Sequence, residues 1–164
     1  MKALFVRHGQ AVDPYLAGSD RDRWLTMEGR VTVERVGAAL KDAGHVPERI
    51  FSSPLVRAVQ TAELLAGATG YAGEIRVWPP LAGGTTALAL GALEEAPDAK
   101  RVMLVGHEPL IRAMASQATG TSIAGFRTGM VCVADIDREN LQGILDPSDL
   151  AWIDAAELLR RLQS

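Results

Sequence analysis

Two histidines and two arginines of this sequence follow short apolar runs. Arg7 and His8 come directly after the first run, His107 follows a later one, and Arg57 lies a few residues beyond a third. Arginine presents a fixed fork of donors that matches phosphate oxygens, and two arginines can neutralise the charge on those oxygens in a transition state. A histidine whose free nitrogen is held in the right tautomer can act as a nucleophile. Together these four side chains suit the transfer of a phosphoryl group.

For a single histidine in a loop, a solvated or capping role is the more common alternative. His45 follows Gly44 at the end of a predicted helix, and we expect it to lie on the surface. Zinc is a weaker interpretation of His8 and His107, because no paired carboxylate or cysteine stands at metal spacing and the arginines would repel a cation. We therefore expect no metal site.

The elements that must position these residues are short apolar runs that alternate with helical patterns, with no linker and no internal repeat. Several runs are almost continuously apolar, which is typical of strands in a sheet covered on both faces. This order predicts an α/β fold, a three-layer α/β/α sandwich around a mostly parallel sheet. The predicted strands are residues 3–6, 49–52, 74–78, 101–105 and 130–136.

Helices are predicted between these strands from apolar spacing and from end signals. Ser53 is expected to cap one helix with Pro54 at its first position, and another helix begins near Pro109 and ends before Gly120. Ligands bind beyond the carboxyl ends of strands in such sheets, so we expect the histidines and arginines to converge there. The remaining predicted helices are residues 27–43, 86–93 and 147–162.

The length and composition limit the class of protein. The chain has 164 residues, which predicts a single domain over residues 1–164. Its 17 basic and 20 acidic residues leave neither the basic surface that binds nucleic acid nor the polybasic cluster that an anionic membrane attracts. Proline and glycine interrupt the longest uncharged stretch, residues 77–93, so no membrane span is predicted. The single cysteine, Cys132, is expected to pack in the core and favours a reducing compartment, so the cytoplasm is the expected location.

Several segments carry a resemblance to a known family. Arg7-His8-Gly9 resembles the signature of the histidine phosphatase superfamily, also called the phosphoglycerate-mutase-like fold. The order and spacing of three further motifs match as well, over roughly residues 1 to 136, and the short chain is most similar to the small phosphohistidine phosphatases of the SixA type. These motifs are Leu25-Thr26-Met27-Glu28-Gly29 for LTxxG, residues 53–62 for SPxxRAxQTA, and Gly106-His107-Glu108-Pro109 for the second histidine.

The resemblance implies a role for four residues. His8 would be the nucleophile that becomes phosphorylated. Arg7, Arg57 and His107 would hold the phosphoryl oxygens, with His107 charged while it does so. The family implies no metal and no organic cofactor, and the expected partner is a phosphorylated protein or a small phosphorylated substrate.

The sequence departs from the wider family at Pro80. Many members that cleave phosphate esters carry a glutamate there, which protonates the leaving alkoxide. Glu108, Asp13 and Asp20 are possible substitutes, although an acidic residue at a helix start and aspartates in a solvated turn are ordinary features. A site without a general acid is better matched to a P–N bond, because imidazole leaves a ring-protonated phosphohistidine as a neutral base.

The sequence therefore leaves three alternative functions. The first is a phosphohistidine or phosphoramidate phosphatase that acts through phosphorylated His8. The second is a small-molecule or nonspecific phosphomonoesterase with a substitute acid. The third is a phosphate-binding regulatory domain with little catalysis, which the complete set of four residues disfavours because a binder needs no nucleophile.

Overall fold

The sheet of the computed structural model, which describes residues 1–163, has seven strands in the order β3-β2-β4-β1-β5-β6-β7. Strands β3, β2, β4 and β1 pair in parallel, and the pairs β1–β5, β5–β6 and β6–β7 are antiparallel. The strands span Lys2–Arg7 (β1), Arg49–Ser52 (β2), Ile75–Val77 (β3), Arg101–Gly106 (β4), Val131–Asp135 (β5), Asn140–Leu145 (β6) and Trp152–Asp154 (β7).

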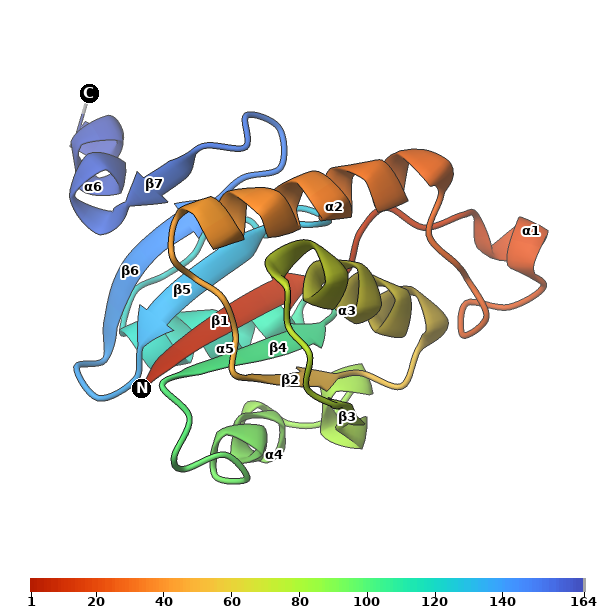
Figure 1. Cartoon of the computed structure of the whole chain (residues 1–164), viewed down its shortest axis with the longest axis horizontal. Helices are drawn as coiled ribbons and strands as arrows, with labels where there is room; N and C mark the ends of the chain where they lie inside the picture. Colours follow the sequence, from red (N-terminus) through yellow and green to blue (C-terminus); the bar gives the residue numbers. More distant parts are fainter. Residues whose placement is uncertain (164) are drawn as a thin grey trace.

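Helices cover both faces of this sheet. Figure 1 shows α2 and α3 in front of the strands and α5 behind them. The α-helices span Pro14–Ala17 (α1), Met27–Asp42 (α2), Val56–Thr69 (α3), Thr86–Leu90 (α4), Leu110–Thr119 (α5) and Ala155–Gln163 (α6), and the short 3₁₀ helices span Pro79–Ala82 (η1) and Gly91–Leu93 (η2).

The two faces of β1 build two separate parts of the core, because successive side chains of a strand point to opposite faces. Leu4 and Val6 pack in one cluster with α2 and α3 residues such as Val33. Phe5 packs in the other cluster with α5 residues such as Met114. The predicted three-layer α/β fold is confirmed, but the sheet is mixed and not mostly parallel, because β5, β6 and β7 add an antiparallel edge to the parallel half.

The parallel half brings three strand ends to one edge. In the register of β1 and β4, Arg7 lies opposite Gly106, and in the register of β2 and β4, Ser52 lies opposite Val105. The residues that follow these three strands therefore begin side by side, as predicted from the order of the elements.

The antiparallel edge corrects the sequence-based prediction at the end of the chain. Residues 147–162 do not form one helix, because Trp152–Asp154 form β7 and α6 begins only at Ala155. Strand β6 was not predicted at all. Pairing with β6 buries Ile153 of β7, and this tertiary contact outweighs the helical spacing of residues 147–162.

Two helix predictions also need correction at their ends. Leu55, and not Ser53, stands at the N-cap of α3, and Pro54 precedes the helix. The predicted helix over residues 86–93 divides into α4 and η2 at Gly91. The helix over residues 27–43 is confirmed to within one residue at its end, and α5 ends before Gly120 as predicted.

His45 is buried, which contradicts the predicted surface position. Its ring lies against the ring of Trp152, with 4.3 Å between the centroids. Burial, followed by the charges of Lys2 and Arg101, lowers the pKa of His45. The prediction was wrong because Trp152 belongs to β7, an element that was not predicted.

Cys132 is buried in β5 as predicted, and burial raises the pKa of its thiol to about 12. Of the helices within residues 1–163, none has the length and apolar character needed to cross a membrane.

Candidate active site

The loop after β1 is held in place by the start of α2. The Thr26 N–H donates to the Gln10 carbonyl oxygen at 3.0 Å, and the Thr26 hydroxyl caps α2 by accepting from the Gly29 N–H at 2.9 Å. A Cβ atom at position 29 would overlap the Gln10 carbonyl oxygen, so the close approach requires glycine. The LTxxG segment is thus a support for the loop that carries His8.

Helix α3 supports the same loop from the other side. The Thr61 hydroxyl accepts from the Gly9 N–H at 3.0 Å and donates to the Arg57 carbonyl oxygen at 2.7 Å. The side-chain oxygen of Gln60 accepts from the Leu25 N–H at 2.8 Å. Neither Gln60 nor Thr61 was expected to support the loop, although both belong to the SPxxRAxQTA segment.

His8 is buried, and its hydrogen bonds define its tautomer. Its Nδ1 lies 2.7 Å from the Gly9 carbonyl oxygen. A carbonyl oxygen can only accept, so Nδ1 carries the proton and Nε2 keeps a lone pair. Burial, with smaller contributions from the charges of His107, Arg57 and Arg7, lowers the pKa of His8 to about 3. His8 is therefore neutral at pH 7 and its free nitrogen is nucleophilic.

Arg57 lies against that free nitrogen. Its Nε donates to Nε2 of His8 at 3.3 Å, its Nη1 donates to the Asp20 carbonyl oxygen at 2.7 Å, and its Nη2 lies 3.2 Å from the Asp20 carboxylate. The same carboxylate pairs with Arg23 at 3.1 Å. The hydrogen bond from Arg23, together with the charge of Arg57, lowers the pKa of Asp20.

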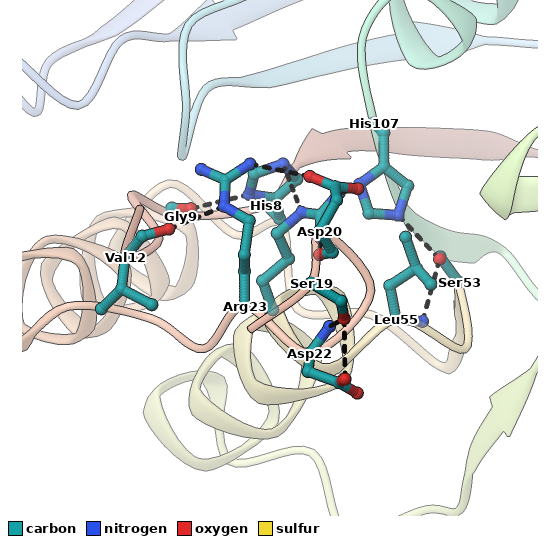
Figure 2. A network of polar contacts seen from close by, with 11 residues as sticks. His8, Gly9, Val12, Ser19, Asp20, Asp22, Arg23, Ser53, Leu55 and His107 are labelled. Carbon is teal, nitrogen blue, oxygen red and sulfur yellow. Dashed lines mark hydrogen bonds and ion pairs between the residues drawn. The ribbon is translucent and has the colours of Figure 1, made fainter. Parts of the chain in front are cut away.

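His107 completes the group on the β4 side. Its ring lies 5.0 Å from the ring of His8 between centroids, and its Nε2 lies 2.7 Å from the Ser53 hydroxyl oxygen. Figure 2 shows Nε2 turned toward Ser53 and the other side of the ring turned toward His8 and Asp20. Burial and then the charge of Arg57 lower the pKa of His107 to about 4. The ring of His107 is therefore neutral at pH 7 in this structure. The charge expected on His107 concerns a ring that holds phosphoryl oxygens, and it stays a prediction.

Arg7 is anchored at one end of its guanidinium. Its Nη1 donates to the Phe126 carbonyl oxygen at 2.8 Å, and its Nε is buried without a hydrogen-bond partner among residues 1–163. The positive charge of Arg7 lowers the pKa values of both His8 and His107, so its guanidinium lies close enough to both rings to affect their protonation. The structure thus gathers all four predicted residues at one edge of the sheet.

The three candidate acids are held in different ways. Glu108 pairs with Arg112 at 3.1 Å, and Asp13 caps α1 by accepting from the Tyr15 N–H at 2.8 Å. Asp20 is the one of the three that contacts Arg57. Pro80 lies in η1, which packs beside the end of β4.

A metal site would be formed by histidine, cysteine, aspartate or glutamate side chains. Within the described residues, no group of three histidine, cysteine, aspartate or glutamate side chains lies close enough together to hold a metal ion.

Comparisons with known proteins agree with the motifs. The model of the histidine phosphatase superfamily (branch 1) matches residues 3–82, which include His8 and Arg57. An uncharacterized protein from Picosynechococcus sp. is 38% identical over 148 residues, covering 79% of this chain and 86% of the relative.

Solved structures extend this likeness over most of the fold. The protein histidine phosphatase SixA complexed with tungstate has a TM-score of 0.83 and 26% identity, covering 92% of this chain and 100% of that chain. A phosphoserine phosphatase from Entamoeba histolytica has a TM-score of 0.68 and 15% identity, covering 92% and 99%, and shares the fold. The chain belongs to the histidine phosphatase superfamily.

Proposed function

We propose that this phosphatase removes the phosphoryl group from phosphohistidine, in a protein or as a phosphoramidate, through a phosphorylated intermediate on His8. The observation that carries this proposal is the state of His8. The His8 ring is neutral at pH 7, and its Nε2 holds a lone pair that accepts a hydrogen bond from Arg57 at 3.3 Å.

The phosphoryl oxygens would be held by the groups around that nitrogen. Arg57 and Arg7 supply charged donors, and His107 adds a neutral one. Such donors act most strongly when they are fixed in advance in a site shielded from water. The tungstate bound to the related SixA structure is a tetrahedral oxyanion, which supports a site of this shape in the present chain.

The reaction then proceeds in two displacements. Nε2 of His8 forms a bond to phosphorus while the P–N bond of the substrate breaks, and the bonding pair stays on the leaving imidazole nitrogen. When the other nitrogen of that ring carries a proton, the imidazole departs neutral. Water then attacks phosphorus, the P–Nε2 bond breaks with its electron pair returning to Nε2, and inorganic phosphate leaves.

The choice of a P–N bond over an ester rests on the candidate acids. An alkoxide is a strong base that leaves slowly unless it is protonated. Pro80 has no proton to give, Asp13 caps a helix, and Glu108 is held by Arg112 at 3.1 Å. Asp20 has a lowered pKa and is ionised at pH 7.

A panel of leaving groups tests this proposal. We expect fast hydrolysis of a phosphohistidine peptide and of phosphoramidate, intermediate rates for an aryl phosphate, and slow rates for phosphoserine and a sugar phosphate. Equal kcat/KM values for alkyl phosphates and phosphoramidate at neutral pH would contradict it. No hydrolysis of any of these compounds, with intact binding of inorganic phosphate, would favour a regulatory domain.

Asp20 is the one candidate acid that contacts Arg57, so the second candidate function is a phosphomonoesterase in which Asp20 first takes up a proton and then gives it to the leaving group. Asp20→Asn tests it, with Asp13→Asn as the matched control in the same loop. If Asp20 is the acid, Asp20→Asn slows alkyl phosphates much more than phosphoramidate, and Asp13→Asn changes neither rate.

A further inference from the structure

Ser53 contacts His107 from a fully buried position. Its hydroxyl oxygen lies 2.7 Å from Nε2 of His107 and accepts from the Leu55 N–H at 3.2 Å. These two groups are the partners of the Ser53 hydroxyl in the part of the chain that the structure describes. Ser53 follows β2 and His107 follows β4, so the contact joins two neighbouring strand ends.

The two contacts of the Ser53 hydroxyl indicate the tautomer of His107. The Leu55 N–H can only donate, so Nε2 of His107 is the sole acceptor open to the Ser53 hydroxyl hydrogen. If Nε2 carried a proton instead, that hydroxyl hydrogen would be buried without an acceptor, which is costly. The neutral ring therefore accepts at Nε2 and carries its hydrogen on Nδ1.

Nδ1 of His107 is buried and has no hydrogen-bond partner among residues 1–163. It lies on the side of the ring that faces His8 and Asp20 (Figure 2). A neutral N–H at this place can donate to a phosphoryl oxygen, whereas a bare Nδ1 lone pair would repel one. The hydroxyl of Ser53 therefore determines whether Nδ1 of His107 presents an N–H that attracts a phosphoryl oxygen or a lone pair that repels it.

We propose that Ser53 is a positioning residue, which fixes His107 in the Nδ1–H tautomer so that its neutral ring donates to the phosphoryl group attacked by His8. The tautomer itself is independent of the substrate, and only its effect on turnover rests on the proposed function. The two histidines then share one tautomer but turn different nitrogens toward the reaction: the lone pair of His8 Nε2 and the N–H of His107 Nδ1.

The direct test is the nitrogen-15 spectrum of the histidine rings in the full chain at pH 7.5, with His107 assigned from its loss in His107→Asn. We expect Nδ1 of His107 to carry the hydrogen in the wild type. In Ser53→Ala we expect a mixture of tautomers or the Nε2–H form, while Ser53→Thr keeps the wild-type form. A wild-type ring with its hydrogen on Nε2 overturns the proposal, whatever the spectra of Ser53→Ala and Ser53→Thr show.

Binding of inorganic phosphate gives a second measurement. Ser53→Ala should bind phosphate about 3- to 10-fold more weakly at pH 7.5, the range of one neutral hydrogen bond. This ratio to the wild type should approach one only as the pH falls below about 4, the pKa of His107, because a protonated His107 donates from both nitrogens. Ser52→Ala is the matched control, since Ser52 is equally buried but donates to the Ser53 carbonyl oxygen and does not touch His107.

The outcomes separate this proposal from the proposed function. A Ser53→Ala defect that stays constant with pH, or that Ser52→Ala reproduces, would reduce Ser53 to a packing role. If no phosphorylated compound is hydrolysed, the spectrum and phosphate binding still decide the tautomer.

Discussion

The Nε atom of Arg57 lies 3.3 Å from Nε2 of His8, so a buried cation donates to the nitrogen that would attack phosphorus. The same guanidinium also binds Asp20 through its two outer nitrogens. A phosphoryl group that approaches Nε2 of His8 therefore also approaches Arg57. The Arg57 N–H can then donate to a charged phosphoryl oxygen instead of the neutral ring nitrogen.

His8 should carry the phosphoryl group during turnover. Incubation with a labelled phosphodonor and quenching without acid should trap label on the protein that is stable to alkali and labile to acid, as a P–N bond is. His8→Ala should show none. Labelling of His8→Ala at the wild-type level would place the intermediate elsewhere.

Arg57→Ala and Arg7→Ala should each lower kcat/KM by about 10² to 10³, the usual effect of removing one fixed charged donor. Lysine at either position should restore activity only in part, because an ammonium lacks the two-pronged geometry of guanidinium. Arg138→Ala is the control, since Arg138 is largely exposed and pairs with Asp135 at 3.8 Å. Near-normal kcat/KM in both site variants would mean that the phosphoryl pocket lies elsewhere.

Gly29→Ala should lower activity, because the new Cβ would overlap the Gln10 carbonyl oxygen and displace the loop that carries His8. Gly67→Ala is the matched control within α3, where a Cβ meets no atom within 4 Å. It should leave activity unchanged and stabilise the fold by about 0.5–1 kcal/mol. Wild-type activity in Gly29→Ala would show that the loop tolerates the shift.

The free energy of unfolding should fall as the pH is lowered from 7.5 to 5. The folded-state pKa values of His8, about 3, and His107, about 4, lie below the ordinary value of 6.5, and that of His45 is lowered as well. The unfolded chain therefore binds more protons below pH 6.5, so this stability is complete above that value and is lost as the pH falls.

Urea unfolding at a series of pH values measures this effect. Carboxylates such as Asp20, whose pKa is lowered below 3.8, contribute at more acidic pH, so the interval above pH 5 reports on the histidines. His8→Asn should flatten the dependence in that interval. A free energy of unfolding that is constant from pH 7.5 to 5 would contradict the neutral state of these rings.

The sequence alone determined the parts of the protein that depend on local patterns. Continuous apolar runs end at Arg7-His8 and at Gly106-His107, and a parallel sheet must bring such ends to one edge. The helix from Met27 and the stop at Gly120 also follow from neighbouring residues, because caps and periodicity act within a few positions.

Only the tertiary structure decided the contacts between residues distant in the sequence. The pairing of Asp20 with Arg57, the bond from Arg7 to the Phe126 carbonyl oxygen, and the contact of Ser53 with His107 each depend on the path of a loop. No local pattern encodes that path, because glycine, serine and aspartate are ordinary residues of turns.

The antiparallel edge has the same physical origin. Asn140–Leu145 becomes a strand because β5 offers it a partner, and Trp152–Asp154 pairs in turn with β6. The burial of His45 against Trp152 follows from that second pairing. Strand formation depends on packing against neighbours more than on intrinsic preference, so the helical spacing of residues 147–162 could not foretell it.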